Sequence, residues 1–313
     1  MRLTILSVAY PLARVGPDAV GGAEQVLTLL DAALTQAGHR SLVIACEGSK
    51  VAGTLIAVPE ISGSLTEPAR EAAQKQHRRA IECALEQWPV NLIHLHGIDF
   101  HKYLPPPGPP ALVTLHLPPS WYPPEIFRLA RPRTYLHCVS NAQRRDCPSS
   151  SLLLPSIQNG VAVGAFQTHH AKRRFAIALG RICPEKGFHI ALDAASRAGV
   201  PLLLGGEVFR YEAHERYYRE QILPRLNGKH RYLGPVGLTR KRRLLAGARC
   251  LLAPSLAPET SSLVAMEALA SGTPVVAFPS GALAEIVEHG RTGFLVRNEQ
   301  EMAEAIAAAH MLD

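Results

Sequence analysis

The stretch PETSSLVAMEALASGTPVVAF, residues 258–278, indicates the fold of this chain most directly. Small and apolar residues at 263–270 predict a helix that is buried on most of its circumference. Gly272 fits the end of that helix, and residues 274–278 are typical of a short, fully buried strand in a parallel sheet. A buried helix that leads at once into a buried strand predicts an α/β architecture.

Two carboxylates stand out in this stretch, Glu259 and Glu267, because most of their neighbours are small or apolar. A carboxylate in a buried helix costs free energy unless a hydrogen-bond donor meets it. Two interpretations of Glu267 follow. Either a core Arg or the backbone satisfies it, or both carboxylates receive the hydroxyl groups of a ligand.

The rest of the chain alternates helical and strand periods, which predicts parallel sheets. A strand is predicted at 3–9, a helix from Gly21 and Gly22 to Gly38, and a polar surface helix at 66–88. Further strands are predicted at 41–46, 92–95, 112–115, 135–139, 175–179, 201–204, 231–233, 250–253, 275–278 and 294–296.

A turn and a polar stretch between residues 154 and 172 predict a domain boundary. We therefore expect two doubly wound domains, 1–160 and 161–313. Ligands of such folds bind at the carboxyl ends of the strands, so we expect the site in the crevice between the domains.

Composition excludes several classes of protein. Hydrophobic residues make up 47% of the 313 residues, which suits two globular domains and excludes disorder. No stretch approaches about 20 uninterrupted apolar residues, so no membrane-spanning helix is predicted. The net charge of +7 suits an anionic partner, whereas dispersed basic residues and few aromatic residues argue against nucleic acid.

The six cysteines contain no C-x-x-C pair, which is typical of reduced thiols in a cytoplasmic protein and indicates no metal site among them. The helix at 66–88 has two interpretations. It is either a solvated surface helix or a peripheral contact with acidic headgroups at the inner face of a membrane.

Two motifs at predicted strand ends suit an anionic ligand. In GRICPEKG, residues 180–187, Arg181 and Lys186 flank a turn that contains Pro, so both can point into one pocket and match a diphosphate. A solvated surface pair is the alternative. In GGAE, the glycines Gly21 and Gly22 let backbone N–H groups approach a ligand, while Glu24 either joins the site or complements the helix dipole.

Three histidines lie at the ends of two neighbouring predicted strands. His94 and His96 alternate on one strand, and His116 ends the next. A metal interpretation of the first two lacks a further ligand at a suitable spacing. We interpret His94 as a core or wall residue and His116 as the functional histidine, because it can donate a hydrogen bond near neutral pH.

Carboxylates that suit hydroxyls, beside cations that suit phosphates, describe a nucleotide-sugar pocket. GRICPEKG resembles the G-R-x-x-x-E-K-G element, and residues 258–276 resemble the E-x7-E element, of retaining glycosyltransferases of family 4 with the GT-B fold. VTLHLP, GGAE, LLLGG, YLGPV, NGV and HGRTGFLV fall in that family's order, so the resemblance covers nearly the whole chain. It implies two Rossmann-like domains that face each other across a cleft, with the acceptor on the N-terminal side.

The resemblance also implies roles for residues. Glu267 would bind the ribose hydroxyls of the donor, and Glu259 would hold hydroxyls of the transferred sugar. Arg181 and Lys186 would neutralise the diphosphate as its bond to the sugar breaks, and His116 would lie beside the sugar. The other residues implied in donor binding are Gly21, Gly22, Gly180, Val236, Thr260, Ser261, Ser262 and Leu263.

The implied activity is the retaining transfer of a hexose-type sugar from a nucleotide diphosphate sugar, such as a UDP- or GDP-sugar. The acceptor would be a glycan, a lipid carrier or a small metabolite, and no cofactor and no obligatory metal are expected. Two alternatives stay open. One is another nucleotide-sugar enzyme of this fold, an epimerase or a sugar-phosphate synthase, and the other is a non-catalytic module that binds nucleotide sugars.

The sequence departs from the family at two places. Thr260, Ser261 and Ser262 stand where many members have Pro-Phe-Gly, so the identity of the sugar does not carry over. Members commonly continue into a helix that crosses back to the N-terminal domain, whereas this sequence stops at HMLD. Two interpretations follow: either the crossing helix is absent, or the sequence is truncated.

Overall fold

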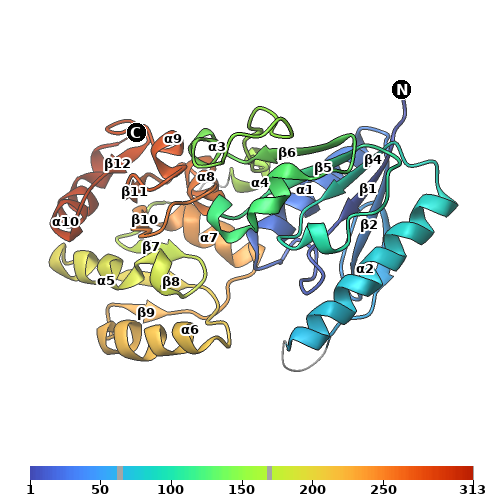
Figure 1. Ribbon diagram of the computed structural model, residues 1–313. Coiled ribbons are helices and arrows are strands. Elements are labelled where there is room, and N and C mark those ends of the chain that lie inside the picture. Colours follow the sequence, from blue (N-terminus) through green and yellow to red (C-terminus); the bar gives the residue numbers. More distant parts are fainter. Residues whose placement is uncertain (62–65, 168–170, 313) are drawn as a thin grey trace. The chain divides into compact units, whose positions relative to one another are not determined.

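The computed structural model describes residues 1–61, 66–167 and 171–312 (Figure 1). Its contacts divide the chain into two units, Met1–Asn159 and Gly160–Asp313. Residues 168–170 of the predicted polar linker lie outside the described residues. Each unit contains a six-stranded sheet in which every paired strand is parallel to its neighbour.

The N-terminal unit has the strand order β3-β2-β1-β4-β5-β6. Its strands are β1 (Thr4–Val8), β2 (Arg40–Cys46), β3 (Thr54–Val58), β4 (Leu92–Leu95), β5 (Ala111–Leu115) and β6 (Thr134–Cys138). Its α-helices are α1 (Gly22–Gln36), α2 (Glu67–Gln87) and α3 (Asn141–Arg145). Short 3-10 helices follow β4 and β5, at Phe100–Lys102, Pro119–Trp121 and Pro124–Arg128.

The C-terminal unit has the order β12-β11-β10-β7-β8-β9, which is the same topology with the strands renumbered. Its strands are β7 (Ala176–Leu179), β8 (Leu202–Gly205), β9 (Arg231–Tyr232), β10 (Cys250–Ala253), β11 (Val275–Ala277) and β12 (Gly293–Leu295). Its α-helices are α4 (Val163–Phe166), α5 (Phe188–Arg197), α6 (Glu212–Tyr217), α7 (Leu238–Gly247), α8 (Leu263–Ala270), α9 (Leu283–Ile286) and α10 (Glu299–Ala308).

Strands β7, β8, β10 and β11 of the C-terminal sheet each supply two hydrophobic cores, because successive side chains point to opposite faces. In β10, Cys250 and Leu252 pack with α5 and α10, whereas Leu251 and Ala253 pack with α8 and α9. These strands are buried on both faces, which explains their continuous apolar sequences. The predicted doubly wound α/β fold is therefore confirmed for both units.

Helix α8 is the helix predicted inside residues 258–278, and no residue of it is exposed. Strand β11 follows after Gly272, whose backbone is left-handed with φ of 63°. This stretch was therefore interpreted correctly at the level of secondary structure.

Two details of the N-terminal unit differ from the sequence prediction. Strand β3 was not predicted, since it lies at the sheet edge, is only five residues long and is mostly half-buried or exposed. The helix at 66–88 was predicted as a polar surface helix, but the structure buries its His77 completely on α2. Its ring packs against Tyr103, with centroids 5.6 Å apart.

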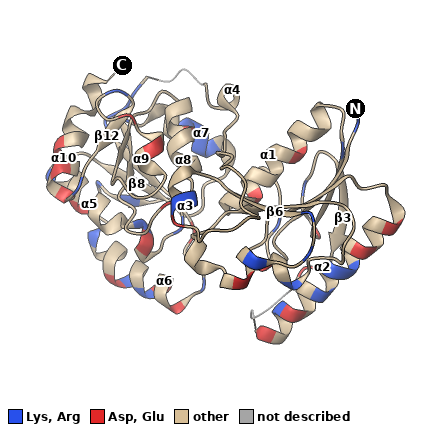
Figure 2. Cartoon of the chain, turned by 45° about the horizontal axis from the view of Figure 1, so that its top comes forward, with Lys and Arg blue, Asp and Glu red and all other residues tan. Residues whose placement is uncertain are grey.

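Helix α2 carries charges of both signs along its length (Figure 2). Its sequence contains four basic and four acidic residues, so the helix has no net charge. Ala73, Ile81 and Ala84 form its buried face. Nowhere in the described residues is there a helix with the length and apolar character needed to cross a membrane.

Candidate functional site

Glycines shape the carboxyl ends of three adjacent strands in the C-terminal unit. Gly180 follows β7, Gly206 follows β8 and Gly234 lies just after β9. The N–H of Gly206 donates to the carbonyl of Gly234 at 2.9 Å, and a Cβ at Gly206 would lie 1.7 Å from the carbonyl oxygen of Gly180. Only a residue without a side chain fits there, so backbone lines this edge of the sheet.

Lys186 and Glu259 meet at this edge, although 73 positions separate them. Lys186 Nζ lies 2.6 Å from Glu259 Oε1, and the hydroxyl of Ser255 donates to the same oxygen. Both charged side chains are largely buried, with exposed fractions of 23% and 12%. The structure thus brings together a predicted phosphate-binding cation and a predicted hydroxyl-binding carboxylate, as an ion pair.

The backbone of Glu259 is fixed by a neighbouring turn. Its carbonyl accepts a hydrogen bond of 2.8 Å from the N–H of Ala282. Gly281 is left-handed, with φ of 58°, and a Cβ there would lie 2.3 Å from that carbonyl oxygen. Because the turn passes so close, the position of Glu259 is set by Gly281 as well as by its side-chain partners.

Glu267 has a cation of its own. Lys241 Nζ on α7 lies 2.5 Å from Glu267 Oε1 on α8, and the two side chains are 14% and 6% exposed. Burial raises the pKa of Glu267, and the attraction of Lys241 opposes this shift. One of the two interpretations expected a core Arg or the backbone to satisfy this carboxylate. The structure instead pairs it with Lys241.

The remaining predicted donor residues lie around these pairs. Thr260, Ser261 and Ser262 connect Glu259 to the first residue of α8, Leu263. Val236 packs at the end of β8, where a Cβ at Gly205 would lie 2.7 Å from Val236 Cγ2. Arg181 follows Gly180 directly, and its charge acts on Glu185 and His214.

In the N-terminal unit, a chain of hydrogen bonds joins β4, β5 and β6. Thr114 Oγ1 lies 2.7 Å from both His94 Nε2 and His137 Nε2, and His137 Nδ1 lies 3.2 Å from the carbonyl oxygen of Cys138. A carbonyl only accepts, so the proton of a neutral His137 resides on Nδ1. Thr114 then donates to His137 and accepts from His94, which fixes the tautomers of both rings.

His116 is joined to His96 across the same sheet. His96 Nδ1 and His116 Nε2 are 3.0 Å apart, and the ring of His96 lies 4.2 Å from that of His94. Burial, reinforced by the neighbouring histidines, lowers the pKa of His94 and of His116 to about 3, and the pKa of His96 also lies well below its usual value. These rings are therefore neutral at physiological pH.

Gln143 on α3 holds the backbone on both sides of His116. Its Nε2 donates to the carbonyls of Leu115 and Leu117 at 2.7 and 2.8 Å, and its Oε1 accepts from the N–H of Val139. The side chain is buried, so these bonds have little competition from water.

Gly21 caps α1, and Glu24 folds back against it. A Cβ at Gly21 would lie 1.9 Å from Glu24 Oε2. A buried carboxylate at this position complements the positive end of the helix dipole, as one of the two interpretations predicted. It also places a negative charge beside Gly21 and Gly22, which favours hydroxyl groups over phosphate as their ligands.

Parts of this chain are similar to known proteins. Residues 173–311 match the family model described as glycosyl transferases group 1. The D-inositol 3-phosphate glycosyltransferase 2 of Catenulispora acidiphila is 42% identical over 83 residues, which are 26% of this chain and 19% of that relative. The chain therefore aligns with about a fifth of that protein's length.

Solved structures extend the likeness of fold to both units. AviGT4, a glycosyltransferase involved in avilamycin A biosynthesis, is 24% identical, with a TM-score of 0.71 over 97% of this chain and 88% of the other. Anabaena HepE, in complex with UDP and glucose, is 22% identical, with a TM-score of 0.72 over 98% of this chain and 89% of the other. The predicted GT-B fold of two Rossmann-like domains is confirmed.

Five polar residues that take part in the ion pairs and hydrogen bonds described above were not predicted from the sequence. They are Lys241, Ser255, Thr114, His137 and Gln143. The sequence contained a signal for Lys241, since the basic run TRKRR, residues 239–243, follows the strand predicted at 231–233. The helical period alone does not tell which of its four cations turns inward.

Proposed function

We propose that the chain is a retaining glycosyltransferase of family 4 that moves a hexose-type sugar from a nucleotide diphosphate sugar to an acceptor. The observation that carries this proposal is the pair of carboxylate–ammonium contacts, Lys186–Glu259 and Lys241–Glu267. Both lie within residues 173–311, which match the family model and contain the glycine-lined strand ends. Carboxylates suit sugar hydroxyls, and cations suit a diphosphate.

Lys186 changes partner when the donor binds. In the free protein its ammonium group neutralises Glu259. A diphosphate carries more charge than one carboxylate, so it attracts Lys186 together with Arg181. Glu259 is then released to accept hydrogen bonds from hydroxyls of the sugar, and the two cations stabilise the negative charge that develops on the leaving diphosphate.

Glu267 keeps its partner. Lys241 holds Oε1 of this carboxylate, which leaves Oε2 to accept a hydroxyl of the ribose. Since Lys241 balances the charge, Glu267 stays ionised in a buried position and is a strong acceptor.

His116 serves as a neutral hydrogen-bonding group for the sugar. Its low pKa keeps it uncharged, and His96 holds one ring nitrogen in place. A neutral ring can form a hydrogen bond with a hydroxyl group of the sugar, and because it carries no charge it does not attract the diphosphate. No metal and no cofactor are part of this proposed reaction, and the acceptor is a glycan, a lipid-linked sugar or a small metabolite.

Donor binding is the first test. HepE was solved with UDP and glucose, so UDP-glucose heads a calorimetric screen that also includes other UDP-sugars and GDP-mannose. We expect one nucleotide sugar to bind, and Arg181→Ala and Glu267→Gln to weaken it about 10- to 100-fold, as the loss of one charge-assisted hydrogen bond predicts. The exposed residues Arg240 and Glu304 supply matched controls, Arg240→Ala and Glu304→Gln.

Turnover is the second test, with release of nucleoside diphosphate measured against a panel of sugar, polyol and lipid-linked acceptors. Formation of a glycosylated product with the anomeric configuration of the donor supports the proposal. A donor converted with no acceptor glycosylated would identify an epimerase. Tight binding with no product from any acceptor would identify a binding module. Unchanged binding in both site variants would overturn the residue assignment.

A further inference from the structure

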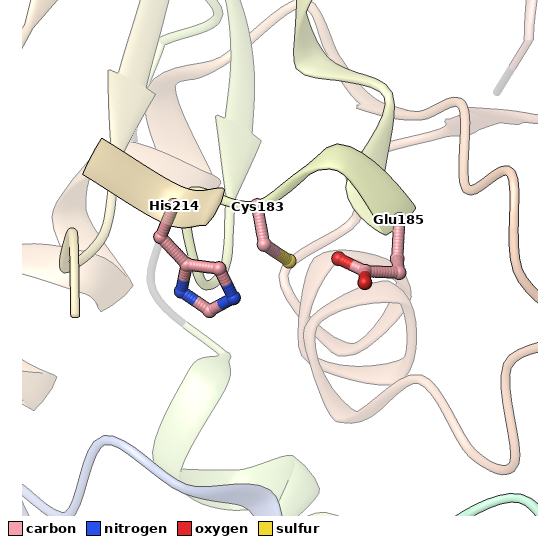
Figure 3. A group of neighbouring side chains, drawn as sticks. All are labelled: Cys183, Glu185 and His214. Atoms are coloured by element: carbon pink, nitrogen blue, oxygen red, sulfur yellow. The ribbon is translucent and has the colours of Figure 1, made fainter. Parts of the chain in front are cut away.

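Three side chains of different chemistry converge beside the loop of residues 180–187. Cys183, Glu185 and His214 each present one ligand atom, and these atoms all lie within 4.8 Å of one another. Figure 3 shows the thiol of Cys183 between the carboxylate of Glu185 and the ring of His214. The group draws on two separate parts of the chain, so it was not visible as a spacing in the sequence.

The local structure holds the three side chains on one side of this loop. Cys183 is buried and precedes the 3-10 helix Pro184–Lys186, which contains Glu185. His214 lies on α6, which packs against that 3-10 helix. The ring of Tyr211 meets the His214 ring edge to face, with centroids 5.1 Å apart, and thereby limits its rotation.

We propose that this group binds one divalent transition-metal ion of the zinc class. A thiolate, an imidazole nitrogen and a carboxylate oxygen are the ligands that zinc takes in proteins, whereas Mg²⁺ and Ca²⁺ take oxygen atoms. Ligand atoms in a tetrahedral zinc site are roughly 3.5 Å apart, which follows from bonds of about 2.0–2.3 Å. The three ligand atoms lie within 4.8 Å of one another, so each pair has to approach by no more than about 1.3 Å to reach that geometry.

The charges of the group also suit a divalent ion. One thiolate and one carboxylate together neutralise it, so the loaded site carries no net charge, and the proton of the Cys183 thiol is released to solvent on binding. Three protein ligands leave a fourth position for water or for an exogenous ligand.

An ion at this position would link three segments of the C-terminal unit. The backbone carbonyl of Glu185 accepts hydrogen bonds from the N–H groups of Leu256 and Ala257, at 2.8 and 3.3 Å. The ion would therefore tie α6 and the 180–187 loop to the segment that leads to Glu259. This role is structural and does not depend on the transfer reaction proposed above.

The test uses the full chain, stripped of metal with a chelator and titrated with Zn²⁺, Co²⁺ and Mg²⁺ in separate experiments. We expect one equivalent of Zn²⁺ to bind and to raise the unfolding temperature, and no comparable effect of Mg²⁺. Co²⁺ should give a near-ultraviolet charge-transfer band that reports a thiolate ligand. Cys183→Ser should abolish that band, and His214→Gln and Glu185→Gln should weaken Zn²⁺ binding at least tenfold.

Two variants at exposed positions are the matched controls. Cys83→Ser and His310→Gln remove a thiol and an imidazole elsewhere, and both should bind Zn²⁺ as the unaltered chain does. His214 lies on a partly exposed helix, so its variant tests the site even if Cys183→Ser fails to fold. Equal binding by the triad variants and the controls would mean an adventitious ion only and would overturn the proposal, as would a Co²⁺ complex without a thiolate band.

Discussion

The two units share one sheet topology, yet their strand ends carry opposite kinds of polar chemistry. In the N-terminal unit, His94, Thr114 and His137 form a chain of neutral hydrogen bonds. In the C-terminal unit, two ion pairs are largely buried, Lys186–Glu259 and Lys241–Glu267. The difference follows from the side chains on the strands, loops and helices of each unit, since the order of the strands is the same.

Under the proposed function, these two kinds of contact would serve two different tasks. A buried ion pair already contains the charges that a diphosphate and sugar hydroxyls require, so the C-terminal unit suits the proposed donor. Neutral rings bind hydroxyl groups in either direction and do not attract phosphate. The fold therefore supplies the positions, and the identity of a few residues supplies the chemistry.

Removal of Lys241 should produce the largest effect. Lys241→Met leaves Glu267 buried at 6% exposure with no cation beside it. Loss of one partner from a buried pair costs about 3–5 kcal/mol of the free energy of unfolding. Urea unfolding followed by far-ultraviolet circular dichroism measures this loss, and hydrogen exchange of the amides in α7 and α8 localises it.

Two further variants separate charge from packing at this pair. Lys241→Met combined with Glu267→Gln removes the uncompensated charge and should recover most of the stability. Arg240→Met, at the exposed neighbouring position, should change stability by less than about 0.5 kcal/mol. A single Lys241→Met variant as stable as Arg240→Met would show that the ion pairs do not distinguish the C-terminal unit.

The sequence predicted the fold well wherever strands are buried on both faces. Residues 92–95 and 250–253 were predicted with the bounds that β4 and β10 have. Strand β3 escaped prediction because a half-exposed edge strand has neither a continuous apolar run nor a clear alternation. His77 escaped because its neighbours on α2 are charged, and only tertiary packing against Tyr103 decides that it turns inward.

The candidate site was predictable in its carboxylates but not in their partners. Glu259 and Glu267 are conspicuous because they interrupt small and apolar residues. Lys186 was predicted as a phosphate ligand, and its pairing with Glu259 joins positions far apart in the chain. Lys241 is one of four cations in TRKRR, and the packing of α7 against α8 selects it. Such pairings depend on the assembled fold.

Acid should weaken the N-terminal unit, with His77 as the clearest contributor. Burial lowers its pKa to about 4, so as the pH falls below 6.5 the unfolded chain takes up a proton before the folded one does. The resulting loss of unfolding free energy is nearly absent above about pH 6.5 and reaches about 2 kcal/mol at pH 5. Both tryptophans, Trp88 and Trp121, lie in this unit, so their fluorescence reports its unfolding.

His77→Leu should make the loss of unfolding free energy between pH 7.5 and pH 5 smaller by about 2 kcal/mol than in the unaltered chain. His310→Leu, at an exposed position of the other unit, should leave that loss as it is. An unchanged pH dependence in His77→Leu would contradict the view that buried neutral histidines set the acid sensitivity of this unit.

A pair of glycine variants tests how firmly the C-terminal unit holds Glu259. Gly281 and Gly290 both have left-handed backbones, with φ of 58° and 78°. Alanine at Gly290 meets no atom within 4 Å, so it should cost only the strain of that conformation, about 1–2 kcal/mol. Alanine at Gly281 meets the Glu259 carbonyl as well and should cost about 1–2 kcal/mol more, with weaker binding of the nucleotide sugar. Equal stability and equal affinity of the two variants, by circular dichroism and calorimetry, would show that the turn at Gly281 does not position the carboxylate.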